Sequence, residues 1–232
     1  MTLVVKSKVV SEHLGDLGDI FEVLRKYKLR LNASKCSFGV GSGKFLGYMV
    51  THRGIKVNPD QIKVINNLQS PRNPKKVQKL TGMAAALNRF ISRSADRCRP
   101  FFLLINKWKG FKWTEECVLA FQQLKDYLAR PPIMSSPESY EVMFAYIAVA
   151  PYVVSLALIR VNCDVQRPVY YVSKSLHEAE VRYLLLKKAI LAIVLGTRKL
   201  PHYFQVHTVV VLTQLLLKAI LRNADYTERI AK

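Results

Sequence analysis

The sequence predicts a mixed α+β chain in two parts, a mainly helical first part and a second part that begins with strands. Hydrophobic residues make up 50% of the 232 residues and charged residues 22%, which is typical of folded domains. Apolar residues recur at helical spacing in several windows before residue 130. After the proline-containing stretch 131–137, β-branched and aromatic residues become frequent.

The first part opens with a predicted helix over residues 12–28. Its apolar residues fall on one stripe, formed by Leu14, Leu17, Phe21, Leu24 and Tyr27. A strand-like pair follows at residues 37–40 and 45–51. The intervening residues Gly41, Ser42 and Gly43 predict a hairpin with a glycine turn.

Three more helices are predicted before residue 130. Asn58 and Pro59 precede a short helix over residues 61–68. Pro74 stands at the first turn of the next helix, which is expected to run to about Ser92. Thr114 is the candidate N-cap of the third, over residues 115–128, because its hydroxyl can accept a hydrogen bond from a free backbone N–H.

The second part has the pattern of a mixed sheet. Three strands are expected first, then a long helix and a further strand, near residues 142–149, 153–161, 168–173, 176–198 and 207–213. Residues 142–159 carry no charge, so a membrane-spanning helix is the alternative for this stretch. Pro151 would kink such a helix, and two strands joined by a tight turn explain the run better.

The charge distribution points to a polyanionic partner. The chain has 36 Lys and Arg against 16 Asp and Glu, which gives a net charge of +20. Residues 51–100 hold eleven basic residues against Asp60 and Asp96, a local surplus of nine positive charges. A surplus of this size indicates nucleic acid or an anionic membrane surface as the partner, and the strand reading of residues 142–159 argues against the membrane.

Several classes of site are absent from the sequence. The four cysteines are far apart, without a C-x-x-C pair, so a zinc site or a disulfide framework is not expected. Reduced thiols suit an intracellular protein of either the nucleus or the cytoplasm. The five histidines show no metal-ligand spacing. Gly39, Gly41 and Gly43 lack the helix start and the Lys-Ser/Thr pair of a phosphate-binding loop.

Five motifs, in this order along the chain, resemble the reverse transcriptases of gypsy-class retrotransposons. They are Leu29-Arg30-Leu31-Asn32 together with Phe45-Leu46-Gly47-Tyr48, then Val77-Gln78-Lys79-Leu80-Thr81-Gly82, Phe111-Lys112-Trp113-Thr114-Glu115, Pro168-Val169-Tyr170-Tyr171-Val172-Ser173, and Tyr203-Phe204 with His207-Thr208. The resemblance implies the end of the polymerase palm at residues 1–57, the helical thumb at 58–130 and a C-terminally truncated RNase H-like mixed sheet at 131–232. It also implies that Phe111 and Trp113 pack the end of the thumb.

The resemblance further implies RNA-directed DNA synthesis and RNA-strand removal, both of which depend on Mg²⁺ held by carboxylates. The aspartates of the polymerase turn match Met1 and Thr2. Three RNase H carboxylates match Ala148, Lys187 and Gln214. A methyl, an ammonium and an amide cannot replace three metal ligands. We therefore expect a degenerate copy without catalytic residues, metal or cofactor.

The nucleic-acid-binding residues expected by resemblance lie mainly on the thumb helix. Gln78, Gly82 and Ala86 fall on one helix stripe, which in the family follows the duplex minor groove. Four cations beside it could meet phosphates of an RNA–DNA or DNA duplex without sequence specificity, namely Lys75, Lys76, Lys79 and Arg89. A second contact, to the primer end, matches Leu46, Gly47 and Tyr48, and a plain core strand explains this stretch equally well.

Two other functional readings stay open. A basic helix face can simply be solvated, which would make the chain a structural or protein-interaction remnant. Alternatively, a partner chain could supply the missing aspartates of an active enzyme. The substituted RNase H positions argue against this last reading.

Overall fold

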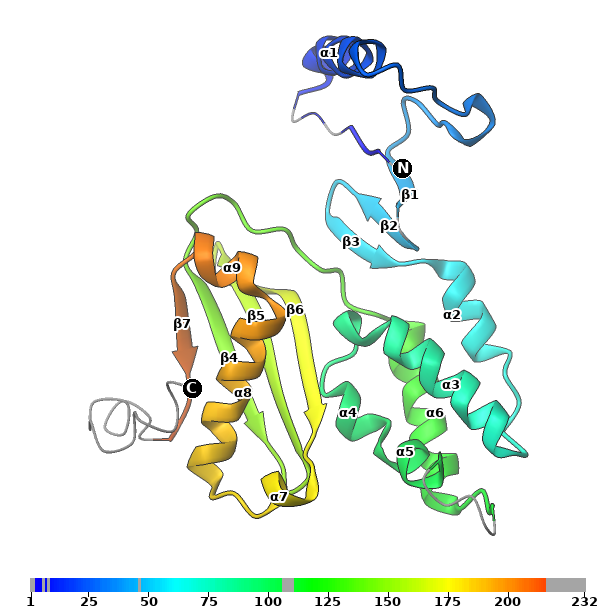
Figure 1. Cartoon of the computed structure of the whole chain (residues 1–232), viewed down its shortest axis with the longest axis vertical. Coiled ribbons are helices and arrows are strands. Elements are labelled where there is room, and N and C mark those ends of the chain that lie inside the picture. Colours follow the sequence, from blue (N-terminus) through cyan, green and yellow to red (C-terminus); the bar gives the residue numbers. More distant parts are fainter. Residues whose placement is uncertain (1–2, 6, 8, 46, 106–110, 216–232) are drawn as a thin grey trace. The chain divides into compact units, whose positions relative to one another are not determined.

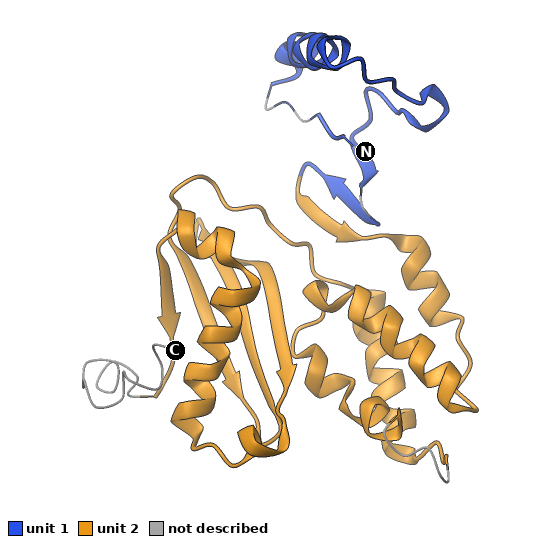
Figure 2. Ribbon diagram, in the orientation of Figure 1, with its two compact units in different colours: residues 1–52 blue, residues 53–232 orange. Residues whose placement is uncertain are grey.

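The computed structural model describes residues 3–5, 7, 9–45, 47–105 and 111–215 (Figure 1). These residues divide into two compact units, residues 1–52 and residues 53–232 (Figure 2). The structure is mixed α/β, as the sequence predicts. No helix in the described part of the chain is long and apolar enough to cross a membrane.

The first unit holds one long helix and a β-hairpin. A 3-10 turn, η1 (Val10–Glu12), leads into α1 (His13–Lys26), and a second 3-10 turn, η2 (Ala33–Lys35), follows. The hairpin pairs β1 (Ser42–Phe45) with β2 (Tyr48–Thr51) in antiparallel register. The helix confirms the prediction for residues 12–28, but only Leu24 of the apolar stripe is buried.

The position of the hairpin corrects the sequence prediction. The predicted strand at residues 37–40 is absent, because Gly39 has a φ of +62° that breaks an extended strand. Gly43 lies inside β1 and not in a turn. Phe45 pairs with Tyr48, so the turn lies between them, where Gly47 supplies a φ of +83°.

The second unit begins with β3 (Gly54–Val57) and a group of helices. Their bounds are α2 (Pro59–Asn66), α3 (Pro74–Ala86), the 3-10 turn η3 (Asn88–Phe90), α4 (Ser94–Arg97), α5 (Arg99–Ile105) and α6 (Glu115–Ala129). Side chains cap three of these helices: Asn58 and Asn73 accept backbone N–H groups at the starts of α2 and α3, and Thr114 caps α6 as predicted.

Aromatic side chains pack together between α5 and α6. The Trp113 ring stacks on Phe101 with centroids 5.7 Å apart and meets Phe121 edge-on at 6.0 Å. Phe101 is fully buried, and Leu124 and Leu128 of α6 complete this core. The prediction that Trp113 packs the end of the helical region is confirmed.

The segment that joins the helices to the sheet is held in place by backbone hydrogen bonds. Met134 exchanges N–H···O bonds with Ile55 of β3, at 2.8 and 2.9 Å, and Ser135 donates to Pro168 O at 2.7 Å. Met134 is fully buried. The proline-containing stretch therefore acts as a fixed connection between the helical group and the sheet.

The sheet has the strand order β6-β5-β4-β7, with β7 parallel to β4 and the other pairs antiparallel. Its strands are β4 (Met143–Val149), β5 (Val153–Asn162), β6 (Val165–Ser175) and β7 (Val209–Leu212). Ala150 donates to Val153 O at 2.8 Å, which closes the tight turn around Pro151. The three predicted antiparallel strands are confirmed, and the single helix through residues 142–159 is excluded.

The long helix predicted at residues 176–198 is in fact two helices. They are α7 (Glu178–Val181), closed by a capping box between His177 and Glu180, and α8 (Leu185–Lys199), which is followed by α9 (Pro201–Val206). The break falls at Leu184, whose ψ of 151° is extended. Helix α8 covers one face of the sheet (Figure 1), where Ala192 and Gly196 are buried. Gly196 lets it approach Leu156, because a Cβ there would come within 2.8 Å of that side chain.

Candidate nucleic-acid interface

Helix α3 has a buried face and a basic, exposed face. Val77, Leu80, Thr81 and Ala84 are buried against the rest of the helical group. All of the predicted binding residues on this helix are exposed: Lys75, Lys76, Gln78, Lys79 and Gly82. The helix thus presents its cations and its glycine to solvent, and its apolar residues to the core.

Gly82 is exposed in the middle of α3 and has no packing role among the described residues. A Cβ built on it would have nothing within 4 Å, and its backbone is ordinary helix. A glycine inside a helix costs about 0.5–1 kcal/mol relative to alanine. The glycine therefore carries a stability cost that no contact of the described chain requires.

Arg89 does not belong to this exposed face, which corrects the predicted set. Helix α3 ends at Ala86, and Arg89 lies in η3. Its guanidinium carbon lies 4.8 Å from the centre of the Tyr170 ring of β6 and 5.5 Å from that of Phe90. The extended backbone at Ile91 ends η3, although the sequence pattern predicted helix as far as Ser92. The exposed face of α3 therefore holds three of the four predicted cations, Lys75, Lys76 and Lys79.

The second predicted contact lies in the β1–β2 hairpin. Gly47 is exposed and Tyr48 is half-buried at the start of β2. Leu46 lies outside the described residues. This hairpin belongs to the first unit, and α3 belongs to the second.

The positions matched to the RNase H carboxylates lie at one end of the sheet. Ala148 is exposed near the end of β4, and Gln214 is exposed two residues beyond β7. In the parallel strands β4 and β7, Tyr146 pairs with Leu212. Ala148 and Gln214 each follow this pair by two residues, so they lie at the same end of the two strands. Lys187 is exposed in the first turn of α8, whose neighbouring residues Ala189 and Ile190 pack against Ile147 and Val149.

These residues do not fit a magnesium site. The pocket at Ala148 has a volume of about 170 Å³ and is lined by one charged side chain, Arg93, which is cationic. Within the described ranges, no three His, Cys, Asp or Glu side chains are grouped so that they could hold a metal ion. Mg²⁺ prefers carboxylate and water oxygens, which this pocket does not offer from its own lining.

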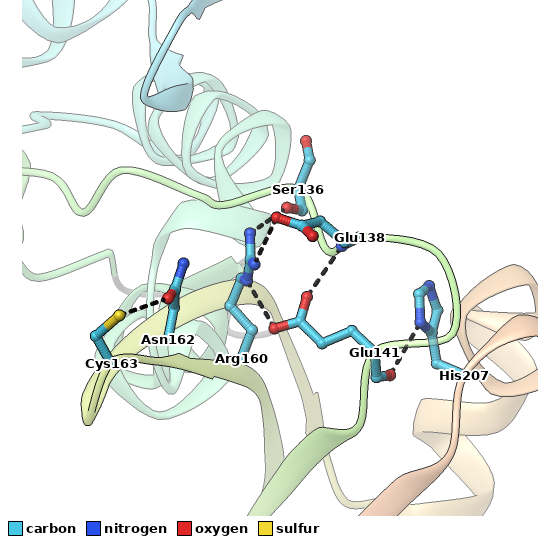
Figure 3. Close-up of polar contacts among 7 residues, drawn as sticks. All are labelled: Ser136, Glu138, Glu141, Arg160, Asn162, Cys163 and His207. Carbon is cyan, nitrogen blue, oxygen red and sulfur yellow. Dashed lines mark hydrogen bonds and ion pairs between the residues drawn. The ribbon is translucent and has the colours of Figure 1, made fainter. Parts of the chain in front are cut away.

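The acidic residues just before β4 serve a structural role instead. Glu141 accepts from Arg160 Nε at 3.0 Å and from the backbone N–H of Glu138 at 2.9 Å (Figure 3). Arg160 also donates to Ser136 O at 2.8 Å, and the His207 ring contacts Glu141 O at 3.1 Å. This cluster fastens the segment before β4 to β5 and to the segment before β7.

The buried thiols offer no nucleophile. Burial raises the pKa of Cys98 to about 12, despite the opposing effect of Arg97, so the thiol stays protonated at neutral pH. Cys117 is also buried, where its Sγ contacts Pro100 O at 3.8 Å.

Sequence reasoning missed two cations near the sheet end, Arg93 and Lys188. Arg93 has a φ of +53° just before α4, and Lys188 is 7% exposed in the first turn of α8. The first turn of a helix usually favours acidic residues, because the backbone dipole makes it positive. The adjacent pair Lys187-Lys188, inside the helix predicted over residues 176–198, was the available signal.

Comparison with known proteins identifies homologues along most of the chain. Residues 113–211 match the model of the RNase H-like domain found in reverse transcriptase. The chain is 30% identical over 202 residues to the retrovirus-related Pol polyprotein from transposon 297 of Drosophila melanogaster, covering 87% of this chain and 19% of that protein. It is 25% identical over 204 residues to the transposon Tf2-3 polyprotein of Schizosaccharomyces pombe, covering 88% and 15%. The chain therefore spans less than a fifth of these relatives.

Solved structures show the same fold. A foamy viral protease–reverse transcriptase in complex with double-stranded DNA matches with a TM-score of 0.75 and 20% identity, covering 95% of this chain and 39% of that one. The same viral protein in complex with an RNA/DNA hybrid matches with a TM-score of 0.74, covering 95% and 30%. Residues 113–211 thus match the RNase H-like domain of reverse transcriptases, and the chain as a whole is similar to part of the Pol polyproteins of retrotransposons.

Proposed function

We propose that this chain binds nucleic-acid duplexes without sequence specificity, through the exposed face of α3, and that it catalyses neither polymerisation nor RNA cleavage. In this proposal residues 1–57 correspond to the end of the palm, 58–130 to the thumb and 131–232 to the RNase H-like domain. The observation that carries it is the exposed Gly82 beside Lys75 and Lys79.

The glycine separates this proposal from a merely solvated helix. A solvated face accounts for lysines but gives no reason for a residue that weakens the helix. A missing side chain allows the backbone of α3 to approach a flat or grooved surface closely. Lysines on either side would then reach phosphates, which position a duplex without reading its sequence.

The structural neighbours support the choice of ligand. The foamy viral proteins are described in complex with double-stranded DNA and with an RNA/DNA hybrid. The proposed inactivity is supported by the residues at the matched positions, since Ala148, Lys187 and Gln214 carry no carboxylate.

The test is a size series at Gly82. Gly82→Leu should lower the affinity for a labelled duplex about tenfold, which corresponds to roughly 1.4 kcal/mol, while circular dichroism shows intact helix. Gly82→Ala should stabilise the fold by about 0.5–1 kcal/mol, because alanine is the better helix former. Gln122→Leu, on the exposed face of α6, is the control for added apolar bulk. Equal duplex affinity of Gly82→Leu and the parent chain would refute the proposal.

A further inference from the structure

Strand β6 is contacted by the helical group at several points along its length. Among the described residues β6 is an edge strand, in the order β6-β5-β4-β7, and α4 lies beside it (Figure 1). Edge strands present unpaired backbone groups, so folded proteins usually cover, shorten or twist them. Here the cover consists of η3, α4 and the joining segment 131–137, and these belong to the same compact unit as the sheet.

Two side chains of β6 hold the stretch from η3 to α4. The Arg89 guanidinium carbon lies 4.8 Å from the centre of the Tyr170 ring, which is the geometry of a cation–π contact. The Ser173 hydroxyl accepts from the backbone N–H of Ala95 at 3.1 Å and is hydrogen-bonded to the Ser155 hydroxyl at 2.9 Å. Ala95 is 8% exposed and Ser155 6%. This polar bridge is therefore largely shielded from water, where losing one partner is costly.

Two further contacts join the same parts of the unit. The Ser135 backbone N–H of the joining segment donates to Pro168 O of β6 at 2.7 Å. The guanidinium carbon of Arg99, at the start of α5, lies 4.1 Å from the centre of the Tyr152 ring, just before β5. The contacts thus come from η3, α4, α5 and the joining segment. A rotation of the sheet relative to the helices would break several of them at once.

We propose that Arg89, Ala95, Tyr170 and Ser173 form a latch that locks the sheet onto the helical group, so that the two unfold and move as one cooperative body. Parts of a chain joined by an exposed linker and few crossing contacts can move and unfold separately. The latch opposes this, and the sheet acts as a brace for η3 and α4. Arg89 is then a positioning residue, whose guanidinium holds η3 against β6. The inference concerns folding and motion, so it does not depend on the proposed duplex binding.

Two fluorescent probes follow the two parts separately in the full chain. Both tryptophans lie within residues 58–130 and report the helical group. Cys163 is exposed in the turn between β5 and β6 and can carry a dye that reports the sheet. Cys36→Ser removes the other accessible thiol, since the remaining two cysteines are buried. One cooperative body gives coincident urea transitions from both probes. Different midpoints in this parent chain would overturn the inference.

A substitution on each side, away from the latch, excludes coincidence by chance. Val209→Ala removes apolar contacts of β7, at the opposite edge of the sheet from β6. Gly82→Ala adds a methyl group to α3 in open space and favours helix. In one cooperative body Val209→Ala lowers the midpoint of both probes equally, and Gly82→Ala raises both equally. A shift confined to the probe on the substituted side would overturn the inference.

The latch itself is tested at its side chains. Tyr170→Leu/Ser173→Ala removes the ring and the hydroxyl, and the two probes should then give separate midpoints. Tyr170→Phe keeps an aromatic face for Arg89 and should keep the transitions coincident. Tyr183→Leu removes a ring that is 43% exposed before α8, and it should also leave them coincident. Coincident transitions in the double variant would show that these side chains do not couple the two parts.

Arg89→Leu is the milder variant if the double variant does not fold. It removes the cation and keeps an apolar side chain between η3 and β6. The inference predicts that both midpoints fall by the same amount, although the substituted residue belongs to the helical group alone. A fall of the tryptophan midpoint without a fall of the Cys163 midpoint would overturn it, because Arg89 would then stabilise only the helices.

Discussion

Gly54 fixes the connection between the helical group and the sheet at the scale of one residue. Its φ is +131°, and a Cβ there would lie 2.1 Å from the carbonyl oxygen of Met134. Gly54 directly precedes Ile55, whose backbone is hydrogen-bonded to that of Met134. Both the backbone conformation and the close approach therefore require glycine.

We expect Gly54→Ala to destabilise the fold by about 2 kcal/mol or more, because the methyl group must displace backbone and φ is unfavourable for alanine. Urea unfolding followed by circular dichroism measures the change. Gly82→Ala is the matched control, since the same methyl group enters open space on α3. Similar unfolding midpoints for Gly54→Ala and the parent chain would contradict the structure around Met134.

At this scale the sequence predicted what local chemistry decides. Thr114 as the N-cap of α6 follows from the residue type itself, and Trp113 as a packing residue follows from the family resemblance. The roles of Arg89 and Lys188 do not, because each depends on a partner far along the chain, Tyr170 for one and Pro151 for the other.

At the scale of elements, Tyr127 ties α6 to the segment that follows α3. Its hydroxyl donates to Phe90 O at 3.0 Å and accepts from the Ser92 backbone N–H at 3.2 Å. The Arg97 guanidinium lies 4.5 Å from the centre of the same ring. These contacts hold the stretch from η3 to α4 in a conformation that is not continuous helix.

Tyr127→Phe should lower the free energy of unfolding by about 1–2 kcal/mol, because two backbone polar groups lose a hydrogen-bond partner. Chemical denaturation measures the difference. Tyr140→Phe removes the same hydroxyl at a position that is 85% exposed and should change stability little. If both variants unfold alike, the hydroxyl of Tyr127 has no structural role.

Element ends were the least predictable feature. The pattern of apolar residues continues past Ala86, but α3 stops there since η3 turns toward β6 and Arg89 packs on Tyr170. The long helix after β6 is likewise interrupted, because the capping box of α7 and the extended backbone at Leu184 start a new helix. Tertiary contacts and caps decide these boundaries, and periodicity alone cannot locate them.

At the scale of the whole molecule, the residues at the positions matched to the RNase H carboxylates predict that the chain does not cleave RNA. With Mg²⁺ present, purified chain should not cleave the RNA strand of an RNA–DNA hybrid, because Ala148, Lys187 and Gln214 cannot hold the ions that the reaction needs. The assay is gel electrophoresis of a labelled hybrid, with an active RNase H as the positive control. Cleavage that copurifies with the chain and requires Mg²⁺ would show that other residues form a metal site.

The succession of strands along the chain could be predicted from the pattern of apolar residues. The resemblance to the family could be recognised because five motifs follow one another in the family's order. The β1–β2 turn lies several residues later in the chain than the sequence predicted. Three nearby glycines offer alternative turns, and the turn forms at Gly47, which has a positive φ. The cations around the β4–β5 turn could not be predicted, because α5, α8 and the segment before α4 meet there only in the fold.

The salt dependence of duplex affinity tests the central claim, that the lysines of α3 bind phosphates. With Lys75, Lys76 and Lys79 in contact, the log–log slope contributed by α3 should be about −2.7, at −0.9 for each phosphate, and Lys75→Gln/Lys79→Gln should reduce the slope by about 1.8. A slope that is unchanged in the double variant would contradict the account, because the charge that binds the duplex would then lie outside α3.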